Sequence, residues 1–483
     1  MPRPPWIRVI TSPIIGAALA AAALALAQTT VTVSPKSGTP TENVSVQGTG
    51  FGPSEAVDIY FDTSDLALAA TNSSGAFSGI HLTIPASAVP GMHWITGIGQ
   101  RSGLAAQTSF VVQTDWSQFH FGSQHHGDNP TENILSVSNA VDLRLLWSVP
   151  IGGDISFSSP AVVNGTVYIG AGECCNSAAE YLYAFDAATG KQLWRADTGG
   201  SVTSSPAVAG GIVYVVGGDL RAFNAASGKL LWKAPASTAT APCSPAVADG
   251  VVYAGSRNGA LQAFDAASGH PLWIAPTGGY LHSSPAVANG VAYVGSDDYK
   301  LHAFDAATGQ SLWAATTGSW IWESPTIENG VVYVGSQDNH LYAFDAVSGQ
   351  TLWSVPSTGT ESSPAVANGT VYVGGGFNLN AFNAATGELL WSAPTGFTID
   401  SSPAVANGVV YVGSYDNYVY AFDAATGQLI WRAPTGFYVE SSPAVANGVV
   451  YVGSDDGNLY AFGLPPAAPP NRPNPATLKT GFP

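Results

Sequence analysis

Charged side chains are scarce in this sequence of 483 residues, and basic ones are the scarcest. Only 10% of the residues are charged, and 15 Lys and Arg stand against 32 Asp and Glu, a net charge of −17. Phosphate repels such an acidic surface, which argues against nucleic acids and anionic membranes as partners. The 55 glycines and 33 prolines are typical of turn-rich β structure rather than of helix bundles.

Cysteine is also scarce, with only Cys174, Cys175 and Cys243 in the whole sequence. Residues 1–27 carry Arg3 and Arg8, then an apolar run that ends in Ala-Leu-Ala, which predicts a secretory signal peptide. A retained membrane anchor is the alternative, because the run is nearly long enough to span a bilayer. No cysteine follows the run, which disfavours a lipid anchor. We expect a secreted or cell-envelope protein without membrane insertion after cleavage, with cysteines in an oxidising compartment.

Residues 28–113 form a first unit. The stretch "TTVTVSPKSGTPTENVSVQGTGFG" alternates apolar and polar residues between turns, as half-buried strands do. Together with "IPASAVPGMHWITGIG" it resembles the IPT/TIG-type immunoglobulin-like domains. The resemblance implies a small β-sandwich that acts as a spacer or adhesion module.

Residues 142–463 repeat with a period near 40. In "SSPAVANGVVYVGSYDNYVYAFDAATGQLIW", residues 401–431, the Asn407-Gly408 pair predicts a type I′ turn between two strands. "YVYAF" predicts a third strand, and "QLIW" begins a fourth after the "AATG" turn. Four antiparallel strands per repeat indicate a propeller blade.

Counting the repeats predicts eight blades and an all-β fold. The "SPAV" element or a close variant occurs eight times, and the fourth-strand tryptophans are Trp147, Trp194, Trp232, Trp273, Trp313, Trp353, Trp391 and Trp431. Trp147 precedes the first "SPAV", whereas no tryptophan strand follows the last "YAF". We therefore expect the strand around "LRLLWSVP" to complete the last blade and close the ring.

The segment "YAFDAATGQLIW" is similar to the tryptophan-docking motif of the pyrroloquinoline quinone (PQQ) repeat family. That family contains PQQ-dependent alcohol dehydrogenases and the non-enzymatic BamB-type assembly proteins. The resemblance implies that the tryptophans pack between neighbouring blades, with a turn glycine (Gly427 for Trp431) that allows close approach. The tryptophans are therefore predicted to be structural.

Two segments flank the repeats. Residues 114–141 carry His120, His125 and His126, which have no recognised metal-ligand spacing. We favour an aromatic, hydrogen-bonded linker packed on the propeller over a metal site. Residues 464–483 are proline-rich, and their composition predicts a disordered tail.

The candidate binding site follows from propeller geometry, since the loops that enter "SPAV" meet around one channel mouth. The residues just before each "SSP" are Phe157, Thr203, Pro242, His282, Trp322, Glu361, Asp400 and Glu440. Three consecutive repeats thus place carboxylates at one arc, and Glu323 adds a fourth. A site for a cation or for a basic or sugar-like ligand is one interpretation; a solvated acidic rim is the other.

Cys174 and Cys175 lie in a lengthened loop of the first repeat, on the same predicted face as Cys243. A strained disulfide between the neighbours, pinning the loop, is favoured, and a bond to Cys243 is the alternative. The family resemblance implies a further role for such a pair, since in the dehydrogenases a vicinal disulfide stacks on the quinone and calcium activates it. Against this, the sequence has no "CxxCH" haem site, its blades are nearly identical, and the family's calcium ligands find no match.

The sequence therefore favours a non-catalytic propeller that binds protein or carbohydrate partners at the cell surface, without a cofactor. A PQQ- and calcium-dependent dehydrogenase and a BamB-like assembly factor remain the alternatives.

Overall fold

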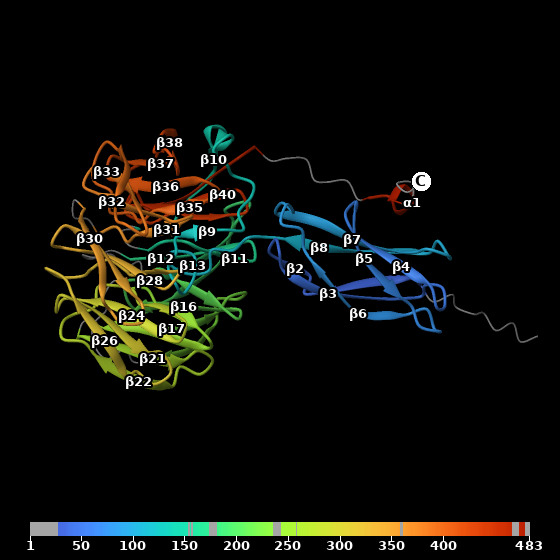
Figure 1. Cartoon of the computed structure of the whole chain (residues 1–483), viewed down its shortest axis with the longest axis horizontal. Helices are drawn as coiled ribbons and strands as arrows, with labels where there is room; N and C mark the ends of the chain where they lie inside the picture. The colour runs from blue at the N-terminus through green and yellow to red at the C-terminus, as the bar shows by residue number, and fades with distance from the viewer. Residues whose placement is uncertain are drawn as a thin grey trace, which may run out of the picture.

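The chain forms two β-rich bodies that lie side by side in the computed structural model (Figure 1). The structure describes residues 28–152, 155, 158–172, 181–234, 243–256, 258–357, 361–465 and 473–478. Within these residues the helices are a 3₁₀ turn, η1 (Ala140–Asp142), and a four-residue helix, α1 (Pro475–Leu478). None of the described helices has the length and hydropathy needed to cross a membrane. The predicted signal peptide, residues 1–27, lies outside the described range.

The N-terminal body is a sandwich of two sheets around one core. The first sheet contains β1 (Thr30–Ser34), β3 (Asn43–Thr49) and β6 (Phe77–Thr83). The second has the order β2 (Ser37–Gly38), β8 (Ala105–Val112), β7 (Gly91–Gly99), β4 (Ala56–Phe61) and β5 (Ser64–Ala70). Alternate residues face the core, as in the exposed-buried alternation of β1, so Val46, Ile59 and Phe110 are completely buried.

The described residues of the second body form a β-propeller of eight sheets, which we number one to eight; each has four antiparallel propeller strands, consecutive in the chain in all sheets but the last. Sheets one to four are β11 (Ala161–Val163), β12 (Thr166–Ala171), β13 (Tyr181–Asp186), β14 (Gln192–Asp197); β15 (Ala207–Ala209), β16 (Ile212–Gly217), β17 (Asp219–Asn224), β18 (Leu230–Ala234); β19 (Ala246–Ala248), β20 (Val251–Ser256), β21 (Ala260–Asp265), β22 (Pro271–Pro276); and β23 (Ala286–Ala288), β24 (Val291–Ser296), β25 (Lys300–Asp305), β26 (Ser311–Thr316).

Sheets five to eight are β27 (Thr326–Glu328), β28 (Val331–Ser336), β29 (His340–Asp345), β30 (Thr351–Pro356); β31 (Ala365–Ala367), β32 (Thr370–Gly375), β33 (Asn378–Asn383), β34 (Leu389–Pro394); β35 (Ala404–Ala406), β36 (Val409–Ser414), β37 (Tyr418–Asp423), β38 (Leu429–Pro434); and β39 (Ala444–Ala446), β40 (Val449–Ser454), β41 (Asn458–Gly463), β10 (Arg144–Pro150). The first strand of each sheet is the innermost. The turn after it is Asn-Gly in six sheets, Gly-Gly in sheet two and Asp-Gly in sheet three, with positive φ at both residues, as at Asn407 (44°) and Gly408 (82°).

Sheet eight is completed by the strand that precedes all the others in the chain. β10 pairs antiparallel with β41, with Trp147 opposite Ala461 and an irregularity between Leu145 and Trp147. The offset between the "SPAV" and tryptophan patterns predicted this pairing. Because the two ends of the ring are joined by backbone hydrogen bonds, β41 is not left as an open edge.

The tryptophans dock each sheet on the next, as the sequence predicts, but the partner glycine differs. Each indole Nε1–H from Trp147 to Trp391 donates to the alanine carbonyl in the turn of the following sheet, for example from Trp391 to Ala424 at 3.0 Å. A Cβ on Gly427 would lie 2.6 Å from Trp391. Gly427 therefore receives the tryptophan of the preceding sheet, and the assignment of Gly427 to Trp431 is wrong. Trp431 itself donates to the Leu143 carbonyl beside β10.

Residues 114–129, which we call the plug, run around the inner strands of the propeller. Trp116 exchanges two hydrogen bonds with Val162 of sheet one. The inner strands of the next six sheets donate backbone N–H groups to the plug, from Val208, Val247, Val287, Ile327, Val366 and Val405 in chain order. β9 (Asp128–Asn129) pairs with β35, and the Asn129 amide donates to Val445 of sheet eight. The plug thus contacts every sheet.

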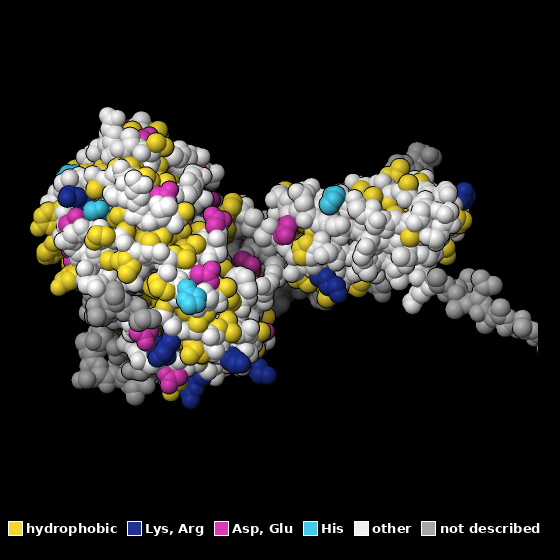
Figure 2. All heavy atoms as spheres, turned by 90° about the horizontal axis from the view of Figure 1, so that it is seen from below, with side chains coloured by type: hydrophobic (Ala, Val, Ile, Leu, Met, Phe, Trp, Pro, Cys, Tyr) yellow, Lys and Arg dark blue, Asp and Glu magenta, His cyan; other side chains and the backbone are white. Residues whose placement is uncertain are grey.

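Few contacts tie the two bodies together. The Asn133 amide, just after the plug, donates to Ala88 of the sandwich at 2.8 Å, and the Gln113 amide donates to Asn164 of the propeller at 2.6 Å. Figure 2 shows the two bodies joined by a narrow neck, and dark-blue basic side chains are sparse on the face in view.

Candidate functional site

A cavity of about 290 Å³ occupies the centre of the propeller. Its wall is formed by serines of the "SPAV" elements, and Phe119 of the plug also lines it. Five residues from the position before "SSP" complete the lining: His282, Trp322, Glu361, Asp400 and Glu440. The structure therefore brings together five of the six binding residues predicted from the sequence.

The serines form a closed circle of hydrogen bonds around the channel. The backbone N–H of each donates to the hydroxyl of the serine in the next sheet, at 2.9–3.0 Å, through Ser159, Ser205, Ser244, Ser284, Ser324, Ser363, Ser402 and Ser442. Ser442 closes the circle by donating to Ser159. Since each N–H is satisfied sideways by a neighbouring sheet, the circle holds the inner strands in register at the depth of the cavity.

Of the eight residues that the sequence predicted to surround the channel mouth, five line the cavity. Thr203 does not line the cavity. Phe157 and Pro242 lie outside the described residues, as do Cys174 and Cys175, so the predicted disulfide is not described. Cys243 is buried, and its Sγ–H donates to the Gly255 carbonyl at 3.3 Å. The alternative bond from Cys243 to Cys174 or Cys175 also involves residues outside the described range.

Glu323 does not line this cavity. It occupies the first position of the serine pair, where Ser283 and Ser362 stand in the adjacent sheets. Its side chain is 2% exposed and accepts a hydrogen bond from the Gln337 amide at 3.1 Å. Burial raises its pKa to about 8. The predicted fourth carboxylate of the arc thus turns away from the channel, beside Ser336 and His340.

The three carboxylates of the arc line the cavity in partly buried positions. Withdrawal from solvent raises the pKa of Glu361, and the charges of Asp400 and Glu440 raise it further. The pKa of Asp400 is also raised by partial burial, against the effect of a hydrogen bond from Tyr415. The Tyr415 hydroxyl donates to Glu440 at 2.6 Å. These carboxylates therefore repel one another across a partly dry cavity.

Aromatic and imidazole groups of sheets four and five continue the lining beside the arc. The Trp322 indole donates to Asp297 Oδ1 at 2.9 Å and lies 5.4 Å from the His282 ring. His282 Nε2 lies 3.6 Å from Asp297 Oδ2. Trp320 stacks on Trp322 with ring centroids 5.5 Å apart and planes inclined by 8°. These groups combine stacked indoles with an imidazole and a carboxylate, and Trp322 and His282 share the cavity with the three carboxylates of the arc.

Sequence reasoning missed the partners Asp297 and Tyr415. Both occupy the variable position before an aspartate that recurs in sheets four, five, seven and eight, in the turn between the second and third strands, as in "GSDDYK" and "GSYDNY". Gln337, the partner of Glu323, occupies the same position. Comparing this position across the repeats would have found a second ring of residues behind the first.

The plug histidines are structural in this arrangement. His120 and His125 are buried, and burial lowers the pKa of each to about 3, so both are neutral. Phe119 stacks on His120 with ring centroids 4.6 Å apart, and His126 lies 3.0 Å from Glu328. Across the described residues, no group of three or more His, Cys, Asp or Glu side chains is placed to hold a metal ion.

A ring of four-stranded sheets around a pocketed channel defines the β-propeller class. The family whose model is described as outer membrane protein assembly factor BamB, a PQQ-like repeat family, matches residues 132–279, 257–398 and 376–464. These matches cover well over half of the sequence, and the chain belongs to this family. Among curated proteins, none matches the chain.

Solved structures share the fold at low sequence identity. A europium-containing methanol dehydrogenase has a TM-score of 0.64 at 15% identity, over 73% of this chain and 98% of its own. BamB from Moraxella catarrhalis has a TM-score of 0.56 at 19% identity, over 67% of this chain and 100% of its own. The designed protein Ika8 has a TM-score of 0.58 at 20% identity, over 66% and 100% of the two chains. At these identities the likeness shows the fold alone.

Proposed function

We propose that this protein is an exported, non-catalytic, eight-bladed propeller whose central cavity binds a basic side chain of a protein partner. The observation that carries the proposal is that Glu361, Asp400 and Glu440 line one cavity together with the Trp322 indole and Phe119 of the plug. No Lys or Arg belongs to the described lining of this cavity. The N-terminal sandwich, proposed as an IPT/TIG-type immunoglobulin-like module, would hold the propeller away from its anchoring surface.

The chemistry of the cavity favours a guanidinium or ammonium group. Carboxylates with raised pKa values repel each other, and a bound cation relieves that repulsion. Trp322 offers an aromatic face to the same cation. A volume of about 290 Å³ is suited to one long side chain rather than to a folded segment.

An outer-membrane assembly factor would also bind protein partners, so this role is compatible with the proposal. The family model is described by that role, and it matches this chain over residues 132–464 in three overlapping parts. The role remains a proposal for this chain.

The described residues do not fit the quinone of the dehydrogenases. PQQ is itself a tricarboxylate, and this cavity presents three further carboxylates to it without a Lys or Arg in the described lining. Trp322 would supply a stacking face, but the charges oppose binding. We therefore propose no oxidation step.

Calorimetric titration tests the cation site directly. The probe is the blocked tripeptide acetyl-Gly-Arg-Gly-amide, with the Gln analogue as the neutral control. We expect the arginine peptide to bind and its affinity to fall at least about tenfold in Glu361→Gln/Asp400→Asn/Glu440→Gln. Glu388→Gln, which neutralises an exposed carboxylate outside the cavity, is the control and should bind the arginine peptide as the parent does.

The same variants separate binding from folding. Because the pKa values of Glu361 and Asp400 are raised in the folded protein, their ionisation at pH 7 opposes folding, and the triple variant should melt no lower than the parent. Equal binding of the Arg and Gln peptides, or binding that survives in the triple variant, would disprove the proposal.

A further inference from the structure

A second cavity lies beside the first, on the loops of sheets three to five. It has a volume of about 590 Å³, and its lining includes Tyr280 and Trp320. These two aromatic side chains are 58% and 43% exposed, respectively. We call this cavity the groove. Trp320 belongs to the groove, whereas Trp322, on which it stacks, belongs to the central cavity, so one pair of indoles separates the two sites.

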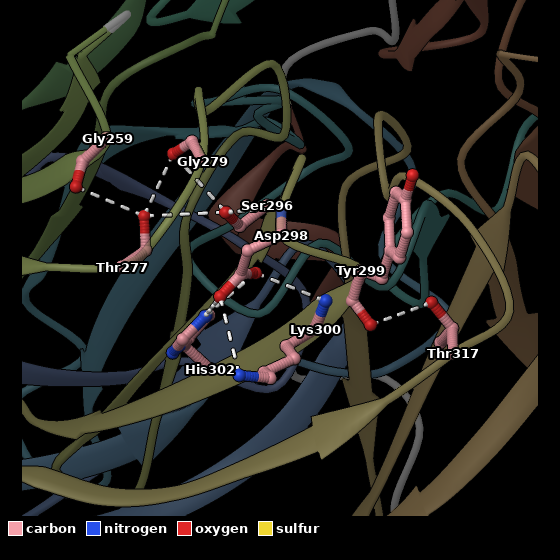
Figure 3. A network of polar contacts seen from close by, with 9 residues as sticks. All are labelled: Gly259, Thr277, Gly279, Ser296, Asp298, Tyr299, Lys300, His302 and Thr317. Carbon is pink, nitrogen blue, oxygen red and sulfur yellow. Dashed lines mark hydrogen bonds and ion pairs between the residues drawn. The ribbon is translucent and has the colours of Figure 1, made fainter.

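The floor of the groove is built from backbone without side chains. Gly259, Gly278 and Gly279 line it. A Cβ on Gly279 would lie 2.5 Å from the backbone nitrogen of Asp298, so this position requires glycine. The Thr277 hydroxyl lies 3.1 Å from the carbonyls of both Gly259 and Gly279, which fixes the loop (Figure 3). A flat ligand can therefore approach the backbone closely on a rigid floor.

The carboxylates at the groove are already engaged. Asp298 beneath the floor pairs with His302 at 3.0 Å and with Lys300 at 3.9 Å (Figure 3). Asp297, which lines the groove, accepts the Trp322 indole N–H and faces His282 at 3.6 Å. Both carboxylates thus already accept hydrogen bonds, and the lining of the groove has one acidic side chain where the central cavity has three, so an uncharged ligand suits the groove better than a cation.

The two aromatic positions are equivalent in neighbouring repeats. Tyr280 lies two residues before His282, and Trp320 lies two residues before Trp322. The equivalent residue of sheet seven, two before Asp400, is Thr398. Tyr438 stands there in sheet eight, but its ring stacks on Tyr415 with centroids 4.9 Å apart. Within the described residues, paired aromatic side chains that line one cavity at this position occur only in sheets four and five.

We propose that the groove binds a neutral saccharide, with a pyranose ring against Tyr280 or Trp320. The C–H face of a pyranose is apolar and packs on an aromatic ring, while its hydroxyls hydrogen-bond to backbone and carboxylate oxygens. The groove supplies both kinds of surface: two exposed aromatic rings, and the oxygens of Asp297 and the glycine loops. This site is separate from the proposed cation site and does not depend on it.

Tryptophan fluorescence and calorimetry of the full chain test the proposal with three probes: cellopentaose, laminaripentaose and chitopentaose. We expect at least one to bind and to quench fluorescence. Trp320→Ala and Tyr280→Ala should each weaken that binding about tenfold. Phe437→Ala, an exposed aromatic outside the groove, should change it less than about twofold. Both groove side chains are exposed, so these variants should fold, and an unchanged melting temperature checks this.

The central-cavity variant separates the two proposals. Glu361→Gln/Asp400→Asn/Glu440→Gln should bind the saccharide as the parent does, whatever its response to the arginine peptide. Absence of binding for all three oligosaccharides would overturn the saccharide proposal, and so would binding unaffected by Trp320→Ala and Tyr280→Ala. Binding of a neutral peptide, acetyl-Gly-Gln-Gly-amide, that is lost in Trp320→Ala would reassign the groove to peptides.

Discussion

At the residue directly before the "SPAV" serine, most of the sheets have a serine with a buried hydroxyl, whereas sheet five has the carboxyl of Glu323. Ser283, Ser362, Ser401 and Ser441 each accept the N–H of a glycine twelve residues later, at 3.0–3.1 Å. Glu323 stands at this position in sheet five, with Gly335 twelve residues on, and a Cβ on that glycine would lie 3.2 Å from the Glu323 carboxyl carbon. A small hydroxyl is thus replaced by a carboxyl in the same buried space, which opposes its ionisation.

Glu323→Gln should remove a pH-dependent loss of stability. The folded pKa is about 8 against 4.5 for the ordinary carboxyl. Between these pH values the unfolded chain loses a proton that the folded chain keeps, so the stability contribution falls as pH rises. Glutamine stays neutral. The variant should gain up to roughly 4 kcal/mol over the parent near pH 9 and nothing near pH 4. Chemical unfolding across this range measures the difference.

Glu388→Gln, an exposed carboxylate, is the control and should show no such trend. A stability difference between Glu323→Gln and the parent that is constant with pH would contradict the raised pKa.

The ring closes through β10, which pairs with β41 and carries Trp147. Each outer-strand tryptophan needs a turn ahead of it, and Trp147 on β10 finds one at Gly190, where a Cβ would lie 2.8 Å from the indole. In the part of the chain that the structure describes, no strand follows β41, and β10 supplies the outer strand of sheet eight. Closure therefore depends on one strand that precedes the repeats in sequence.

Trp147→Ala should destabilise the propeller by about 3 kcal/mol, because a half-buried indole and its hydrogen bond to Ala187 are lost. Trp273→Ala, the equivalent change within sheet three, should cost a similar amount. Removing residues 144–150 should do more, since it exposes the edge of β41. Sedimentation should then show concentration-dependent association that neither single variant shows. A monomeric deletion variant with the parent's melting temperature would contradict strand closure.

At the scale of the whole molecule, the plug joins all eight sheets through one short segment. Its contacts follow the chain order of the sheets, from Trp116 on sheet one to Asn129 on sheet eight. Most of these contacts are backbone hydrogen bonds to buried inner strands, which would otherwise lose their partners. The plug is thus part of the propeller rather than a tether between two bodies.

Truncation tests whether the plug stabilises the propeller or only tethers it to the sandwich. A chain beginning at residue 114 lacks the sandwich but keeps the plug, whereas a chain beginning at residue 130 lacks both. We expect the second to melt roughly 5 °C or more below the first, because the inner-strand N–H groups lose their acceptors. Equal melting temperatures in calorimetry would show that the plug adds nothing to propeller stability.

The sequence by itself determined the repeated fold. The Asn-Gly turns, the "SPAV" strands and the tryptophan spacing are local patterns with direct backbone meanings, and the offset of Trp147 predicted closure through β10. It also placed His282, Trp322, Glu361, Asp400 and Glu440 together, because equivalent positions in a ring of repeats share one mouth.

Only the tertiary structure decided which way side chains at neighbouring positions turn. Glu323 directly follows Trp322, which lines the central cavity, yet the Glu323 side chain is buried beside Ser336 and His340. The circle of serine hydrogen bonds, the path of the plug and the Tyr280–Trp320 groove each join residues far apart in sequence. Such contacts depend on how closed sheets meet, and no local pattern encodes that geometry.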